Sequence, residues 1–167
     1  YWVETGVNSW GSANYTFDSD LEGWTTQSPC IGSYNWSWLS DSGNGTLFAE
    51  DVGSNSAQVI LSPVQDVSTC FDNITLSYRH KYSTESCCDH GYVAYRLDGG
   101  SWTQFFPETG SYSGSDGQYN EPLMNSCSYS GSMQLYYGSS GYAEHSGQID
   151  VTTASTLEIA FVFTSDG

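Results

Sequence analysis

Basic side chains are nearly missing from this sequence. Only 3 of its 167 residues are Lys or Arg, against 19 Asp and Glu, which gives a formal net charge of −16 at pH 7. Binding to nucleic acid depends on cations that neutralise phosphates, so we exclude nucleic acid as a partner. The same charge argues against binding to an anionic membrane surface. The sequence also has no run of 18 or more apolar residues, so we expect no membrane insertion.

Helical patterning is missing as well. No window carries apolar residues at positions i, i+3, i+4 and i+7 over three turns, so we expect almost no helix. The chain instead holds 13 Tyr, 7 Phe and 6 Trp, residues that favour strands, together with 18 Gly. The length suits one domain with a core of its own, or one unit of a longer protein.

The common catalytic motifs are absent too. The sequence contains neither GxSxG nor HExxH, and no nucleophile motif accompanies His80, His90 or His145. Asp98 falls in a turn, which explains it without catalysis. A two-carboxylate glycosidase stays open as an alternative because acids are plentiful. Our prediction is that the protein is not an enzyme.

The clearest pattern that is present runs from Ile74 to Phe106. Large side chains alternate along both halves of this stretch, as on half-buried strands. They are Leu76, Tyr78, His80, Val93, Tyr95 and Leu97. Asp98-Gly99-Gly100 predicts a tight turn because both glycines tolerate positive φ. We therefore expect Tyr92–Leu97 and Ser101–Phe106 to pair as an antiparallel hairpin.

Other short strands are predicted along the rest of the chain. They are Tyr1–Val7, Leu47–Val52, Ala57–Leu61, Asn73–Tyr82, Met133–Tyr137 and Leu157–Phe163. Many short strands separated by turns are typical of a β-sandwich or jelly roll.

Cysteines and glycosylation motifs both indicate an extracellular location, either secreted or at the cell surface. The five cysteines fit an oxidising compartment, and their odd number leaves one thiol free or bridging between chains. A zinc site at Cys87-Cys88-x-His90 has no second ligand pair at the usual spacing, so disulfides are preferred, with Cys87 or Cys88 reaching Cys127. The cysteines are Cys30, Cys70, Cys87, Cys88 and Cys127.

Four N-x-Ser/Thr sequons make N-linked glycans an expected modification. Their asparagines are Asn14, Asn35, Asn44 and Asn73. The sequence begins at Tyr1 and not at Met, which we interpret as processing or trimming.

Several of these segments, in this order, resemble MAM-like jelly-roll domains of secreted and cell-surface proteins, found beside secreted metallopeptidases and in adhesion receptors. The resemblance covers most of the chain except 107–141. The more specific segments are the DGGSW hairpin and the terminal FTSDG. The others are FDSDLEGWTT, NWSW, LSPVQDVS and the ITLSYRHKY stretch. The resemblance implies a two-sheet antiparallel jelly-roll sandwich, usually non-catalytic and often holding a structural calcium ion.

Calcium takes six to eight oxygen ligands, so clustered carboxylates suit it, and it would relieve the repulsion among the acids. The resemblance places Asp18, with Asp20 beside it, at the acidic group of the family's first strand motif. Glu50 and Asp51 are further candidates, Glu85 with Asp89 could form a second site, and Glu4 would complete the cluster around Asp18. Exposed acids with no ligand role are the alternative for each.

One departure from the family concerns its last strand. Family members continue after SDG into a strand that completes a sheet, and here that strand is replaced by an N-terminal segment with the same character. The segment is Tyr1–Val7, with Tyr1, Trp2, Val3, Glu4 and Val7 as its assembly residues. Circular permutation, a tandem repeat cut at this seam, and donation of the strand to a neighbouring subunit all fit. We accordingly divide the chain into a strand and connector, 1–13, and a jelly-roll domain, 14–167.

The sequence thus predicts an extracellular, calcium-stabilised, glycosylated structural protein whose partner is itself. Strand addition at a sheet would join copies into a filament or tandem array. The alternative is a carbohydrate-binding or adhesion module of a larger secreted protein. Exposed aromatic side chains would form its sugar platform, with Trp10, Trp36, Trp38, Tyr136 and Tyr137 as candidates.

Overall fold

The computed structural model describes residues 2–8, 13–27, 34–53, 56–85, 88–116 and 133–165, with 2–8, 115 and 116 described by their backbone. Every regular element in these ranges is a strand, which confirms the all-β expectation for the described part. In chain order the strands are β1 (Trp2–Asn8), β2 (Thr25–Gln27), β3 (Ser37–Asp41), β4 (Asn44–Phe48), β5 (Ser56–Leu61), β6 (Gln65–Asp66), β7 (Asn73–Ser83), β8 (His90–Leu97), β9 (Thr103–Gln104), β10 (Gly114–Asp116), β11 (Met133–Leu135), β12 (Ser139–Asp150) and β13 (Thr156–Ser165).

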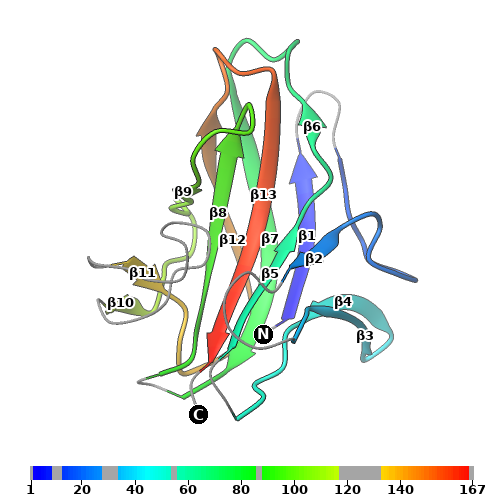
Figure 1. The fold of residues 1–167 in the computed structure, drawn as a ribbon, viewed down its shortest axis with the longest axis vertical. Helices are drawn as coiled ribbons and strands as arrows, with labels where there is room; N and C mark the ends of the chain where they lie inside the picture. Colours follow the sequence, from blue (N-terminus) through cyan, green and yellow to red (C-terminus); the bar gives the residue numbers. More distant parts are fainter. Residues whose placement is uncertain are drawn as a thin grey trace.

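The long strands form two antiparallel sheets that lie face to face, as in a sandwich (Figure 1). Sheet A has the strand order β12-β7-β1-β4-β3, and sheet B has the order β2-β5-β13-β8-β9, with β6 also pairing with β13. One hydrophobic core joins the two inner faces. Leu76 and Ile149 enter it from sheet A, and Val93 and Phe161 enter it from sheet B. All pairings between strands are antiparallel, which confirms the expected sheet type.

The outer face of sheet B is also buried. Val59, Tyr92, Ala94 and Val162 form a second apolar cluster with Met133 and Leu135 of β11. The small β10–β11 sheet, shown at the side of the molecule in Figure 1, contributes to this cluster through β11, which lies beside β8. β13 is buried on both faces because its residues belong alternately to the inner core and to this second cluster.

The predicted hairpin is present with a different turn. Ala94 pairs with Gln104 and Tyr95 with Thr103, so β8 and β9 are antiparallel as expected. The residues with positive φ are Asp98 (52°) and Gly99 (67°), and Gly100 N–H donates to the Leu97 carbonyl. The turn thus centres on Asp-Gly, the usual type I′ pair, and not on the two glycines. Asp98 also accepts bonds from the Ser155 and Thr156 amides, which holds the hairpin against the β12–β13 turn.

Strand ends differ from the sequence prediction in one place that bears on function. The strand expected at Leu47–Val52 ends at Phe48, so Glu50 and Asp51 lie in the following loop. There Asp51 accepts a hydrogen bond from the Gly53 amide, a local turn contact. In the described residues no helix has the length and apolar character needed to cross a membrane.

Candidate assembly joint

The segment singled out as the assembly strand occupies an interior position of sheet A. β1 pairs with β7 along its whole length, from Trp2 opposite Lys81 to Asn8 opposite Thr75, and with β4 at Trp2 and Val3. Tyr1 lies outside the described residues. In this single-chain structure β1 occupies its own sheet, and the seat between β7 and β4 would accept a strand from another copy only after its own β1 had left.

The inner side of this seat is made by the alternating large residues of β7. Leu76, Tyr78 and His80 are buried, as the alternation predicted. In the pairing register they stand opposite Val7, Thr5 and Val3 of β1. A strand in the seat therefore borders a buried row of side chains in sheet A.

His80 belongs to a buried network of ring side chains that the sequence did not predict. Its Nε2 lies 2.9 Å from the Nε2 of His145 on β12, and the two rings are perpendicular. The Tyr136 hydroxyl lies 2.6 Å from that of Tyr78 and 3.3 Å from His145 Nδ1. Both hydroxyls, both Nε2 atoms and His145 Nδ1 therefore have partners inside the core.

Burial sets the protonation of the network. Desolvation, with a smaller contribution from the neighbouring His145, lowers the pKa of His80 to about 2. Desolvation also lowers the pKa of His145 and raises the pKa of Tyr136. Both histidines and the phenol are neutral at pH 7, so one imidazole donates its Nε2–H to the other. A His on the apolar face of an alternating strand signals burial, but its partner on β12 could not be found without the fold.

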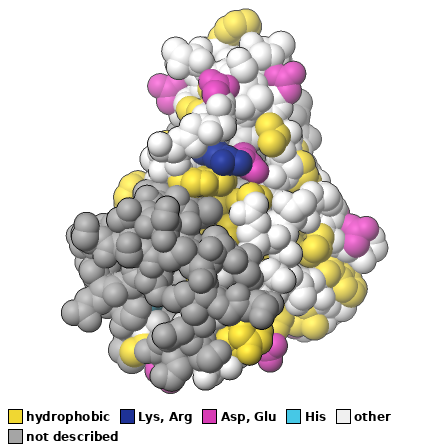
Figure 2. Space-filling model, in the orientation of Figure 1, with side chains coloured by type: hydrophobic (Ala, Val, Ile, Leu, Met, Phe, Trp, Pro, Cys, Tyr) yellow, Lys and Arg dark blue, Asp and Glu magenta, His cyan; other side chains and the backbone are white. Residues whose placement is uncertain are grey.

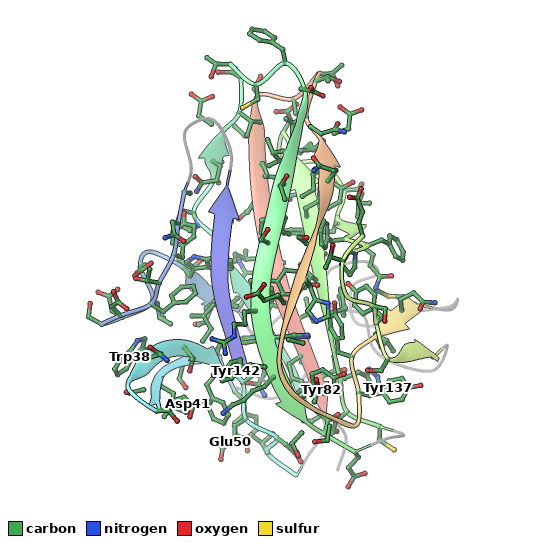
Figure 3. All side chains as sticks on the ribbon, turned by 180° about the vertical axis from the view of Figure 1, so that it is seen from behind. Trp38, Asp41, Glu50, Tyr82, Tyr137 and Tyr142 are labelled. Carbon is green, nitrogen blue, oxygen red and sulfur yellow. The ribbon has the colours of Figure 1, made fainter. Side chains whose placement is uncertain are left out.

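The outer side of the seat carries a charged cluster. Asp41, in the β3–β4 hairpin, forms an ion pair with Lys81 of β7 and accepts a hydrogen bond of 2.8 Å from the Tyr142 hydroxyl of β12. These contacts lower the pKa of the Asp41 carboxyl, with the Lys81 bond contributing most. Figure 3 shows Asp41 and Tyr142 near the lower end of sheet A, where β1 begins.

The strand order shows that this cluster connects strands on both sides of β1. Asp41 lies on β3, on one side of β1, and Lys81 and Tyr142 lie on β7 and β12, on the other side. Their contacts therefore connect the two halves of sheet A across β1. We call Asp41, Lys81 and Tyr142 the clasp.

Two of the three cations of the chain lie beside β1. The side chains of Arg79 and Lys81 both stack on the Tyr142 ring, 4.5 and 4.9 Å from its centroid. Arg79 stands opposite Glu144 of β12 and opposite Glu4 of β1 in the register. The third cation, Arg96, pairs with Glu158 in sheet B. On the face drawn in Figure 2, one basic group is visible among scattered carboxylates.

The acids proposed as calcium ligands occupy several places. Asp18 and Asp20 lie in the loop before β2, where Asp20 accepts a bond from the Glu22 amide. Asp89 is buried beside the start of β8, and Glu85 is exposed after β7. Among the described side chains, no three of His, Cys, Asp or Glu are close enough together to hold a metal ion. The side chain of Glu4 lies outside the described residues.

Two cysteines are described. Cys88 is disulfide-bonded, and Cys70 is a free, half-buried thiol. Cys30, Cys87 and Cys127 lie outside the described residues, so the expected bridge to Cys127 stays a prediction.

The four sequon asparagines are all exposed. They are Asn14, Asn35, Asn44 and Asn73. Their exposure is what attachment of a glycan to the folded chain requires.

The aromatic residues suggested for a sugar platform do not share one surface. Trp36 and Tyr136 are buried in the core, and the Trp36 indole donates to the Gln58 carbonyl. Trp38 is 37% exposed, but its indole N–H donates to the Phe17 carbonyl at 2.6 Å. Trp10 lies outside the described residues. Trp24 is buried in the core.

Comparisons with known proteins identified no related protein. No protein-family model matches this chain, and neither the search of curated proteins nor that of solved structures found a match. The class that fold and site define is an all-β, sandwich-like protein with a terminal strand in an interior sheet position. Its function has to be argued from that geometry.

Proposed function

We propose that this chain is an extracellular structural subunit, a jelly-roll sandwich of MAM-like type, that assembles with copies of itself by strand addition. In the assembly, β1 of one copy occupies the seat between β7 and β4 of the next. The donated strand would make the same backbone hydrogen bonds and face the same side chains as β1 does within one chain.

The position of β1 carries the proposal. Its two neighbours in sheet A, β7 and β4, are both distant from it in sequence, and the next strand along the chain, β2, lies in sheet B. β1 therefore makes no pairing with the strand that follows it. A strand of this kind can be supplied by its own chain or by another with little change in its contacts, which is the basis of strand exchange and of donor-strand polymers.

The consequences for assembly follow from symmetry. Donation from one copy to the next is a head-to-tail contact, which need not close on itself and therefore generates a filament. An empty interior position leaves two rows of unpaired backbone groups, on β7 and on β4, so the seat would not persist unoccupied. Calcium and N-linked glycans belong to the proposal as stabilising additions. The net charge of −16 supports the former and the four exposed asparagines support the latter.

A cross-strand disulfide tests which chain supplies β1. Gly6 and Ser77 stand opposite each other in the β1–β7 register, so cysteines at both positions can form a bridge when the strands pair. We would introduce Gly6→Cys and Ser77→Cys together with Cys70→Ser, which removes the free thiol among the described cysteines. After oxidation under assembly conditions, non-reducing electrophoresis should show a ladder of covalent multimers.

The matched controls are the two single-cysteine variants, which should give no ladder beyond one dimer band. A double variant that oxidises completely and stays a monomer would contradict the proposal, because β1 would then belong to its own chain. Electron microscopy of the unmodified chain provides the second readout, since filaments with a regular axial repeat are expected. Deleting residues 1–7 should abolish those filaments.

A further inference from the structure

Exposed apolar residues lie at β3, on the margin of sheet A. Tyr34, Trp38 and Leu39 are 45%, 37% and 39% exposed, and they fall within one short segment at β3. Figure 3 shows Trp38 and Asp41 on the curved β3–β4 hairpin at the side of the molecule. Trp38 pairs with the core residue Leu47, and Leu39 pairs with Thr46, so the two side chains lie on opposite faces of β3, with Leu39 on the same face as Asp41.

The strand that carries these residues, β3, is an edge strand. β3 ends the order of sheet A, and among the described residues it pairs with β4 alone. Edge strands are usually protected by lysine, proline or a bulge, because their unpaired backbone groups recruit strands from other molecules. Within Ser37–Asp41 the only charged side chain is Asp41, which is engaged in the clasp. By sequence alone, β3 is an unprotected edge.

Two of the four sequons lie at the two ends of this strand. Asn35 lies two residues before the first residue of β3, and Asn44 begins β4 opposite Asp41. Both asparagines are exposed. The residues next to them are fixed: Trp36 is buried and bonded to the Gln58 carbonyl, and Thr46 donates its hydroxyl to the Leu39 carbonyl. The backbone therefore holds both asparagines at the protein surface, one at each end of β3.

We propose that Asn35 and Asn44 carry N-linked glycans that cover the β3 edge and the exposed Leu39 side chain. Asn44 pairs with Asp41, which lies on the same face of β3 as Leu39, so a sugar on Asn44 would extend beside Leu39. The glycans would occupy the space that a strand from another copy needs in order to pair with β3. They would thereby leave the β1 seat as the site of chain-to-chain pairing, and this part of the inference rests on the proposed function.

The modification needs a co-reactant from outside the protein. A glycosyltransferase would supply a lipid-linked sugar phosphate as donor. The Asn Nδ2 attacks the anomeric carbon, a C–N bond forms, the bond from that carbon to the phosphate oxygen breaks, and the lipid phosphate leaves with the bonding electrons. The amide proton passes to a base of the transferase. No oxidation or reduction takes place.

Glycopeptide mass spectrometry of the full chain, purified from its native source or from a secreting host with N-glycosylation, tests the modification directly. Sugar on both Asn35 and Asn44 is expected. If either asparagine is unmodified, the proposal is overturned, whatever the outcome of the cross-strand disulfide experiment.

The shielding role has a separate test. The double variant Asn35→Gln/Asn44→Gln should associate laterally, measured as increased light scattering and as sheets or bundles in electron micrographs. The control Asn14→Gln/Asn73→Gln removes the same number of sequons and should behave as the parent chain. Adding Leu39→Lys to the first variant should restore the parent behaviour, because a lysine protects an edge strand. Equal scattering from the first variant and its control overturns the shielding role.

Discussion

His80 and His145 share a contact between their Nε2 atoms inside the core, so both rings are held neutral at pH 7. Among the described side chains, the rings next to His80 are Tyr78 and Tyr82 on β7 and Tyr136 after β11. A positive charge on either imidazole would therefore meet neutral rings in the described part of the core.

This arrangement predicts loss of stability in acid. Burial lowers the pKa of both histidines in the folded chain, whereas unfolded histidine has a pKa of about 6.5. Below that pH the unfolded chain takes up protons that the folded chain excludes, so stability is complete above pH 6.5 and falls as the pH decreases. The slope is up to about 1.4 kcal/mol per pH unit for each proton.

Urea unfolding between about pH 7 and about pH 5 measures this slope, in a range where ordinary carboxylates titrate little. The double variant His80→Leu/His145→Leu is the control, and its stability should vary less with pH. An equal slope in parent and variant would show that other groups cause the dependence. Relief of acid–acid repulsion acts in the opposite direction, so it cannot imitate the effect.

Gly45 illustrates a steric requirement at a single residue. A Cβ at this position would lie 1.5 Å from the Phe17 carbonyl oxygen and 2.8 Å from the Trp38 indole nitrogen. That oxygen is the acceptor of the Trp38 hydrogen bond, and Phe17 itself has a positive φ of 54°. The hairpin packs this closely against the loop before β2 only because residue 45 has no side chain.

We therefore expect Gly45→Ala to lower the free energy of unfolding by about 3 kcal/mol or more. Gly141→Ala is the matched control, because a Cβ there would meet no atom within 4 Å, and its effect should stay within about 0.5 kcal/mol. Chemical denaturation of the two variants gives both values. Similar stabilities would mean that the loop at Phe17 moves to make room.

At the scale of elements, the clasp predicts how firmly β1 is held. Lys81→Met keeps an apolar side chain on the Tyr142 ring and removes the ion pair with Asp41. Backbone amides of β1 should then exchange with solvent faster, while those of β13 should not change. Hydrogen exchange followed by mass spectrometry resolves the two strands. Arg96→Met, which breaks an ion pair in sheet B, is the control and should leave β1 protection unchanged.

The strands and one hairpin were accessible from the sequence because their signals are local. Alternation in β7 and the Asp98-Gly99 turn specify strand, face and turn within a few residues. The pairing of β1 with β7 and β4, the contact of Asp41 with Tyr142 and the His80–His145 pair join segments far apart in the chain, and no local pattern encodes them. Two of the acids proposed as calcium ligands also follow turn chemistry, because the Asp20 and Asp51 carboxylates accept hydrogen bonds from nearby backbone amides.

At the scale of the whole molecule, net charge is the property that most affects contact between copies of the chain. With a net charge of −16, copies of this chain repel one another, and the proposed contact between copies would need screening or a bound cation. If calcium takes part, EDTA should lower the melting temperature of native material, and calcium should restore it where sodium at the same ionic strength does not. An unchanged melt in EDTA would remove calcium from the proposal, and recovery with sodium would assign the effect to screening.

The long antiparallel register of β1 with β7 also has a mechanical consequence. Hydrogen bonds between antiparallel strands run perpendicular to the strand axis. A pulling force directed along β1 would load the whole β1–β7 ladder at once, so the strand would have to shear free in one step and could not peel away bond by bond. A thread joined through this strand would accordingly resist tension along its length far better than a sideways tear.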